Sequence, residues 1–109
     1  MQDEVRYMSE NISDNRKKML IDNLAKNLPV LRAKIGINQT ELADKIGITR
    51  QTLTAIESGK RTMTWMTFVA LTLLFLQNEE TKILLPVVDI YTDELKNFFS
   101  FGRSDGEGK

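Results

Sequence analysis

The sequence predicts an all-α protein, a compact bundle of five or more helices. Apolar residues recur at intervals of three and four along most of the chain, which is the period of one helical face. Glycine follows several of these apolar runs, in the position where helices commonly end. No segment shows the strict alternation of apolar and polar residues that is typical of a strand. The 109 residues suffice for one domain of ordinary size.

The first helix is expected to follow Ser13, an N-cap residue, with Asp14 at its positive end. Pro29 lies inside the helical run and removes a backbone hydrogen bond, so we expect it to kink the helix or to divide it near Asn27. Gly36 occupies the position after the last turn. The apolar face repeats at helical spacing, at Leu20, Leu24, Leu28, Leu31 and Ile35.

Two shorter helices follow, each with its own start and stop signals. Asn38 is a candidate N-cap, and Glu41 three residues later completes a loose capping box in a helix that Gly47 ends. Thr49 is the expected N-cap of the next helix, which Gly59 ends. Two helices of roughly eight to ten residues, joined by a short turn that contains glycine, have the geometry of a helix-turn-helix.

The fourth helix, predicted to follow Thr64 and to cover residues 65–77, is apolar on nearly all sides. A helix of this kind must be covered on more than one face. Residues 83–88 and 95–99 of the same subunit are one possible cover. The other is the same helix of a second subunit, and Trp65 is assigned either to the core or to that interface.

The rest of the chain contains a break at Asn78, a segment over residues 81–91 that Pro86 interrupts, and a last helix after Thr92. The organisation expected from these signals has four parts. They are a frayed leader (residues 1–12), the helix-turn-helix domain (13–78), C-terminal helices that cover the core or dimerise (79–101), and a polar, glycine-rich disordered tail (102–109).

Composition excludes several kinds of site. The chain has no cysteine and no histidine, so it has no disulfide, no thiolate or imidazole ligand and no Ser-His or Cys-His nucleophilic pair. We therefore expect no enzymatic activity, no metal and no cofactor. The longest apolar stretch falls short of the about 20 residues that cross a bilayer, and the first residues lack a signal-peptide pattern. These features predict a cytoplasmic protein that does not bind membranes.

Charge is unevenly distributed although the formal net charge is zero. Residues 24–61 hold seven basic side chains against three acidic ones, a local surplus of four positive charges that the rest of the chain cancels. A neutral chain is not typical of a protein that binds nucleic acid through charge alone. The surplus coincides instead with the two short helices.

The string at residues 38–61, NQTELADKIGITRQTLTAIESGKR, closely resembles the lambda-repressor-like helix-turn-helix family. This family includes phage repressors, Cro proteins and Xre-type bacterial regulators. The opening glutamine, the turn glycine and the apolar positions fall in the family's register, and residues 28–32 fit its first helix. The resemblance covers about residues 24–76. It breaks down at residues 62–66, where family members commonly have a proline.

The resemblance implies that the third helix, residues 49–58, enters the major groove of double-stranded DNA. Arginine can bond guanine bidentately, glutamine can bond adenine, and a small methyl side chain suits a thymine methyl. Glu57 is expected to be structural, as a cap or as a partner of Arg32 or Lys60. The predicted base contacts are Arg50, Gln51, Thr52 and Ala55. The predicted phosphate contacts are Gln39, Thr49, Thr54, Ser58, Lys60 and Arg61.

Together these inferences predict a sequence-specific transcriptional regulator that binds double-stranded DNA as a homodimer and represses transcription. One alternative is a protein-interaction module that keeps the fold. Another is an antitoxin whose C-terminal helices bind a protein partner. The neutral charge and the apolar C-terminal half favour these alternatives, whereas Arg50-Gln51 and Lys60-Arg61 favour DNA.

Overall fold

The computed structural model describes residues 12–100, and every regular element in that range is a helix, which confirms the all-α prediction. Most of the predicted leader and all of the predicted tail lie outside the described residues. No helix within this range combines the length and hydropathy needed to cross a bilayer. The helices are α2 (Asp14–Ile35), α3 (Gln39–Ile46), α4 (Arg50–Glu57), α5 (Trp65–Leu76), α6 (Glu79–Lys82), α7 (Leu84–Val87) and α8 (Asp93–Phe98).

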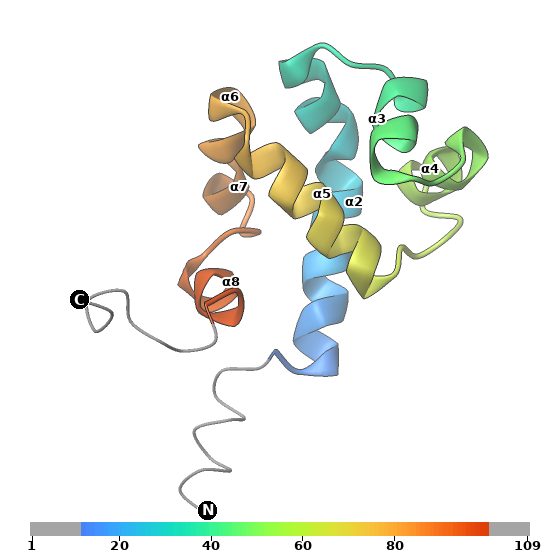
Figure 1. Ribbon diagram of the computed structural model, residues 1–109. Coiled ribbons are helices and arrows are strands. Elements are labelled where there is room, and N and C mark those ends of the chain that lie inside the picture. The colour runs from blue at the N-terminus through green and yellow to red at the C-terminus, as the bar shows by residue number, and fades with distance from the viewer. Residues whose placement is uncertain (1–11, 101–109) are drawn as a thin grey trace, which may run out of the picture.

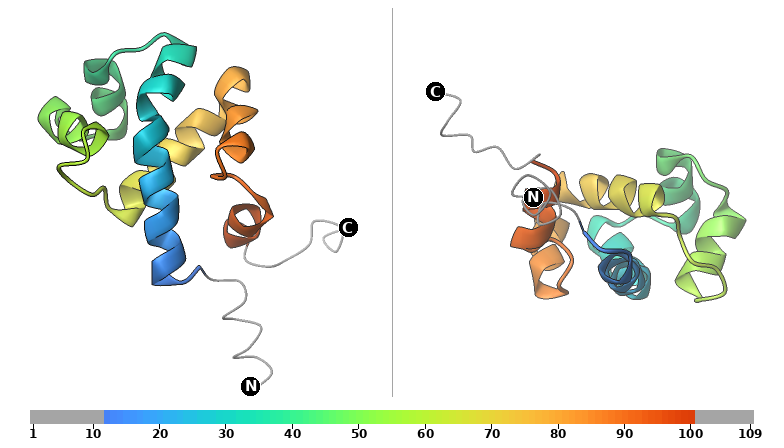
Figure 2. Two further views of the ribbon diagram at one scale, coloured as in Figure 1. Left: turned by 180° about the vertical axis from the view of Figure 1, so that it is seen from behind. Right: turned by 90° about the horizontal axis from the view of Figure 1, so that it is seen from below.

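Helices α2 and α5 pack against each other in the middle of the molecule and separate two flanks (Figure 1). On one flank α3 packs against α4 and α5, and α4 packs against α2. The C-terminal helices α6, α7 and α8 occupy the opposite flank, as the views from behind and from below also show (Figure 2). The helix-turn-helix and the C-terminal helices therefore offer separate surfaces.

Helix α2 runs without interruption through Pro29, which excludes the division near Asn27, one of the two outcomes that the sequence left open. Its start is as predicted, because the Ser13 side chain accepts a hydrogen bond from the amide of Arg16. Pro29 lies on the exposed side of the helix. Burial of apolar side chains before and after the proline offsets the one backbone hydrogen bond that it removes. The fully buried leucines of α2 are Leu20, Leu24, Leu28 and Leu31.

The next three helices begin at the predicted caps. Asn38 accepts a hydrogen bond from the amide of Glu41, whose carboxylate accepts one from the amide of Asn38, which completes the capping box. The side chains of Thr49 and Thr64 each accept a hydrogen bond from the amide three residues later. These bonds satisfy amides that have no partner inside a helix.

Helix α5 is largely covered within the chain itself. Helices α2, α3 and α6 pack around it, so the cover comes from the same subunit but largely from helices other than the expected residues 83–88 and 95–99. Of those two segments, residues 95–99 contact α5 through Phe98, which meets Trp65. A strip on its outer side stays exposed, with Met66 and Leu73 one above the other two turns apart. The second alternative, contact with another subunit, can therefore apply only to this strip. The buried side chains of α5 are Phe68, Leu71, Thr72 and Phe75.

An aromatic cluster joins α5 to the last helix. Trp65 stacks on Phe68, with 4.8 Å between ring centroids, and meets Phe98 edge to face at 5.5 Å. The ammonium group of Lys17 lies 5.0 Å from the centroid of the Trp65 ring. Arg16 in the same turn of α2 forms an ion pair with Glu94 of α8 at 2.8 Å. Trp65 thus belongs to the contact between α5, α2 and α8.

The predicted break at Asn78 and the predicted helix after Thr92 are confirmed, because Asn78 caps α6 and Thr92 precedes α8, but the predicted interruption at Pro86 is wrong. Helices α6 and α7 part at Ile83, whereas Pro86 lies within α7. In a helix as short as α7 the amide that proline lacks has no helical acceptor, so Pro86 is tolerated there. Thr81 instead attaches α6 to the end of α5, because its hydroxyl donates to the carbonyl oxygen of Phe75 at 2.6 Å.

Candidate nucleic-acid interface

The turn between α3 and α4 directs the second helix across the first. Gly47 ends α3 with φ at 82°, in the left-handed region that favours glycine. The amides of Gly47 and Ile48 both donate to the carbonyl oxygen of Ala43, which closes the turn. Ile48 packs against the core, and Thr49 then caps α4. The first turn of α4 is thereby left exposed.

Helix α4 has one buried and one exposed face. Leu53 and Ile56 are buried and hold the helix against α2 and α3. At about 100° per residue Gln51 lies on the opposite side, where it is exposed together with Arg50. Within residues 12–100 neither Arg50 nor Gln51 has a hydrogen bond or ion pair through its side chain. Both are available to an external partner.

The other two predicted base contacts, Thr52 and Ala55, are less accessible. Both are half-buried and lie to one side of Gln51 on the helix. The Thr52 hydroxyl oxygen accepts a hydrogen bond from Thr49 at 2.9 Å. Of the four predicted base contacts, the structure thus fully exposes Arg50 and Gln51.

Beneath this face four side chains connect α2, α3 and α4. Glu57 accepts two hydrogen bonds from Arg32, with Nε–Oε2 at 2.7 Å and Nη2–Oε1 at 2.9 Å. Gln39 donates from Nε2 to Oε1 of Glu57 at 2.9 Å, and the hydroxyl of Thr54 donates to Oε1 of Gln39 at 2.8 Å. The expected pairing of Glu57 with Arg32 is confirmed. The four residues, hereafter the polar network, hold α3 and α4 in a defined relative position.

The ion pair with Glu57 favours the charged form of Arg32. Its hydrogen bond to Glu57 raises the pKa of Arg32 above the ordinary value; partial burial acts in the opposite direction, and the negative charge of Glu57 adds to the rise. Arg32 also donates from Nη1 to the carbonyl oxygen of Ile37 at 3.3 Å, in the turn before α3. A permanently charged guanidinium therefore anchors the start of α3.

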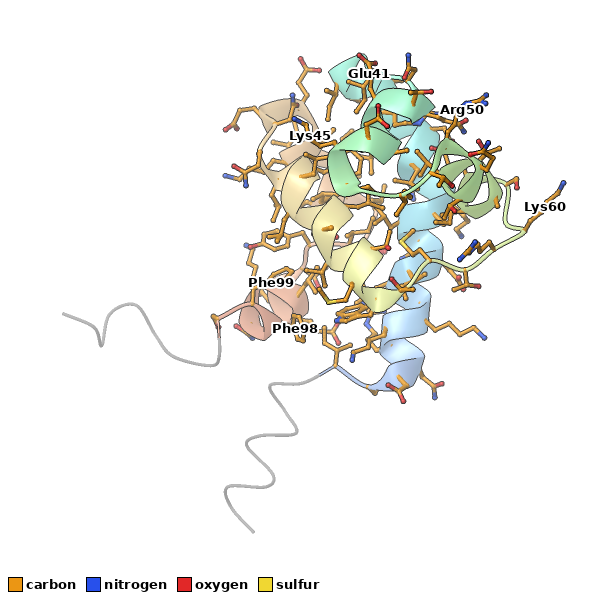
Figure 3. All side chains as sticks on the ribbon, turned by 45° about the vertical axis from the view of Figure 1, so that its right-hand side comes forward. Glu41, Lys45, Arg50, Lys60, Phe98 and Phe99 are labelled. Atoms are coloured by element: carbon orange, nitrogen blue, oxygen red, sulfur yellow. The ribbon has the colours of Figure 1, made fainter. Side chains whose placement is uncertain are left out.

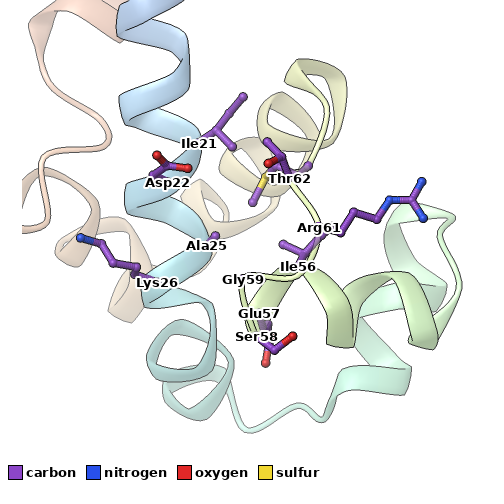
Figure 4. A pocket seen from close by; sticks show the side chains of 11 residues that line it. Ile21, Asp22, Ala25, Lys26, Ile56, Glu57, Ser58, Gly59, Arg61 and Thr62 are labelled. Carbon is purple, nitrogen blue, oxygen red and sulfur yellow. The ribbon is translucent and has the colours of Figure 1, made fainter.

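Two of the predicted phosphate contacts, Lys60 and Arg61, follow α4 in an exposed segment. Neither forms an ion pair with an acidic residue in the described part of the chain. Lys60 and Arg50 lie on the same side of the molecule, on the flank away from Phe98 and Phe99 of α8 (Figure 3). Arg61 extends away from α2 (Figure 4). Within residues 12–100, Arg50, Lys60 and Arg61 therefore form no ion pair, and Arg50 and Lys60 share one flank.

The hydroxyl groups among the predicted phosphate contacts already donate inside the protein. Thr49 donates to Oγ1 of Thr52, Thr54 to Gln39, and Ser58 to the carbonyl oxygen of Ala55, at 2.9, 2.8 and 3.2 Å. A phosphate oxygen accepts hydrogen bonds and donates none. Each hydroxyl would have to leave its present acceptor to bind phosphate, which weakens these three assignments relative to Lys60 and Arg61.

Several hollows border the exposed face, among them one between the start of α4 and the segment after it, lined by Thr49, Thr52 and Arg61. Two others differ in their charge. The first lies at the N-terminus of α3, where the first backbone amides and the helix dipole favour an anion. The second lies between α2 and the segment that follows α4, and its wall carries both Asp22 and Lys26, so it has no preference for one sign of charge (Figure 4). The first hollow is lined by Arg32, Asn38, Gln39, Thr40 and Arg50.

Sequence reasoning missed two features of this region. Thr40 lines the first hollow, and its place as the second residue of a capped helix, where amides lack helical acceptors, was the available signal. The hydrogen bond between Thr54 and Gln39 joins residues 15 positions apart and has no signature in the local sequence.

Comparison with known proteins finds a family model and a relative that are similar to this region. Residues 31–64 match the family model described as helix-turn-helix. An uncharacterized HTH-type transcriptional regulator of Methanothermobacter thermautotrophicus is 48% identical over 29 residues, which are 27% of this chain. The match covers 42% of that relative, less than half of its length. No solved structure matches the chain.

Proposed function

We propose that the chain is a transcriptional regulator of the lambda-repressor-like kind that reads double-stranded DNA with α4, which the helix-turn-helix match at residues 31–64 supports. One observation carries the proposal: in the first turn of α4, Arg50 and Gln51 are exposed, and their side chains have no partner among residues 12–100. Arginine and glutamine at this place can bond guanine and adenine through the major groove. Lys60 and Arg61 beside them supply charge for the backbone.

We place the DNA so that both short helices contact it. The first turn of α4 enters the major groove, and the N-terminus of α3 meets the adjacent backbone with a phosphate in the hollow beside Gln39 and Arg50. Lys60 and Arg61 contact the backbone at the other end of α4. The polar network supports this arrangement because it holds the two helices in one relative position.

We further propose that the protein acts as a homodimer. A single reading helix covers only a few base pairs, so two subunits on half-sites about 34–36 Å apart improve specificity. The exposed strip of α5 supplies an apolar surface for such a contact, since Met66 is 72% exposed and Leu73 45% exposed. In a two-fold dimer this strip would meet its own copy.

Selection of bound sites from a random duplex pool tests the DNA-binding proposal. We expect an enriched sequence with two-fold symmetry, because each subunit would read one half-site. A reporter gene with the selected site between its promoter and coding sequence then tests repression, and expression should fall when the protein is present. A pool without enrichment at low salt would contradict sequence-specific binding.

A second candidate function, the binding of a protein partner through the C-terminal helices, rests on a different observation. Ile83 and Val87 are large apolar side chains that stay exposed where α6 meets α7. They lie four positions apart, on the flank opposite to the DNA face. An antitoxin would use the two flanks in this way, one for DNA and one for a protein. If the random duplex pool shows no enriched site, protein binding through the C-terminal helices would be favoured over DNA binding.

A further inference from the structure

The side-chain amide of Gln39 is held at both ends. Its Nε2 donates to the Glu57 carboxylate at 2.9 Å, and its Oε1 accepts from the Thr54 hydroxyl at 2.8 Å. Gln39 is the first residue of α3, whereas Thr54 and Glu57 belong to α4. The amide therefore spans the contact between the two helices of the motif.

Only one orientation of this amide is favourable. If Oε1 and Nε2 exchanged places, the carbonyl oxygen would face the Glu57 carboxylate, and two acceptors would then lie within hydrogen-bond distance without a proton between them. The observed orientation uses the carbonyl oxygen and one of the two protons on Nε2. One N–H of Gln39 remains for an external acceptor.

That remaining N–H belongs to a side chain that lines the hollow at the N-terminus of α3. The same hollow is lined by Arg50 and by Thr40, the second residue of α3, where amides lack helical acceptors. An anionic oxygen is the group that suits these donors. Under the proposed function this anion is a phosphate of the DNA backbone.

We propose that Thr54 is a positioning residue for phosphate binding by Gln39. Its hydroxyl holds the Gln39 amide so that the free N–H is presented to the phosphate before DNA arrives. This inference rests on the proposed DNA binding and replaces the direct phosphate contact that the sequence suggested for Thr54. The hydroxyl proton of Thr54 is already used by Gln39, so its effect on DNA reaches the phosphate through the amide.

The positioning role of Thr54 predicts how changes at Thr54 and Gln39 combine in the free energy of DNA binding. Because Thr54 acts only through Gln39, the effects of changing the two residues must not add. Because a backbone phosphate carries no sequence information, the loss must also be the same on every duplex. A direct contact between Thr54 and DNA would instead produce independent, additive losses.

The experiment compares Thr54→Val, Thr54→Ser, Gln39→Ala and the Thr54→Val/Gln39→Ala pair in the full chain. Affinities are measured by fluorescence anisotropy on the selected duplex and on duplexes with single base changes. Thr54→Val should weaken binding about threefold to tenfold on all duplexes, the range of one hydrogen bond. Thr54→Ser keeps the hydroxyl and should bind like the parent. In the Gln39→Ala background Thr54→Val should change nothing further.

A measurement without DNA separates this inference from the proposed function. In proton NMR of the free protein, the Gln39 amide proton that is bonded to Glu57 should exchange slowly with solvent, and Thr54→Val should speed this exchange because the amide is then held at one end only. If the parent binds no duplex, the proposed function fails and the phosphate role fails with it. If the parent binds and Thr54→Val binds equally well, or if the losses add, the positioning role is overturned while DNA binding stands.

Discussion

The guanidinium of Arg32 and the carboxylate of Glu57 face each other in a two-pronged ion pair, with Nε–Oε2 at 2.7 Å and Nη2–Oε1 at 2.9 Å. Arg32 belongs to α2 and Glu57 is the last residue of α4, so the pair attaches the reading helix to the longest helix of the fold. The Glu57 side chain is only 7% exposed, and it also accepts a hydrogen bond from Gln39. The position of α4 thus depends on a nearly buried charge.

Removal of one partner of this pair should destabilise the protein strongly. We expect Arg32→Met to lower the free energy of unfolding by about 3 kcal/mol, because Glu57 would keep a buried charge without its cation. The double change Arg32→Met/Glu57→Leu should recover much of that loss, since it removes both charges. Urea denaturation followed by circular dichroism measures both. A loss for the single change below about 1 kcal/mol, the range of exposed pairs, would contradict this account.

Arg50→Ala and Gln51→Ala should each cost about 1–3 kcal/mol of specific binding, because each removes a bidentate base contact. Both side chains are exposed, so the melting temperature should barely change. Anisotropy titrations on the selected duplex, with a scrambled duplex as control, measure the loss. If both variants bind the selected duplex as tightly as the parent, the placement of α4 in the major groove is wrong.

Lys60→Ala should weaken binding to a similar extent on all sequences and reduce the slope of log affinity against log salt by about one unit. The matched control is Lys82→Ala, which removes an exposed lysine from α6 on the opposite flank. The control should leave the slope unchanged. Equal slopes for the two variants would show that Lys60 contacts no phosphate.

Replacing a buried threonine by valine should stabilise the fold at Thr72 and destabilise it at Thr81. The Thr72 hydroxyl on α5 is buried and has no hydrogen-bond partner among the described residues, so Thr72→Val should stabilise the fold by about 1 kcal/mol. The Thr81 hydroxyl donates to the carbonyl of Phe75, so Thr81→Val should destabilise by about 1–3 kcal/mol. Thermal denaturation of both variants is the test. A loss of stability for Thr72→Val would indicate that its hydroxyl has a partner after all.

Met66→Glu and Leu73→Glu should convert the proposed dimer to monomers without unfolding it, because both side chains are exposed on the outer strip of α5. Light scattering of the parent and the variants measures the mass. Val30→Glu, at an exposed apolar position of α2, is the matched control and should leave the dimer intact. Leu76, although apolar, packs against the core and is unsuitable for this test. If the parent stays monomeric at high concentration, α5 is not a dimer interface in the absence of DNA.

The sequence alone predicted where most helices begin, because a cap is a local interaction. The capping residues Ser13, Asn38, Thr49 and Thr64 each bond an amide three residues later, and these contacts depend on no other part of the fold. At Pro29 the same reasoning left both a kink and a break open. Burial of leucines on both sides of the proline kept the helix whole, and this energy comes from helices far along the chain.

For the candidate site, the sequence determined which residue types are present and which helical face they share. The period of α4 placed Leu53 and Ile56 inside, so Arg50 and Gln51 had to lie outside.

Only the tertiary structure decided which side chains meet across helices. It paired Glu57 with Arg32 and left Lys60 free, and it brought Thr54 to Gln39. Helical periodicity determines the direction of a side chain about its own axis, whereas the distance between two helices depends on how their buried faces pack.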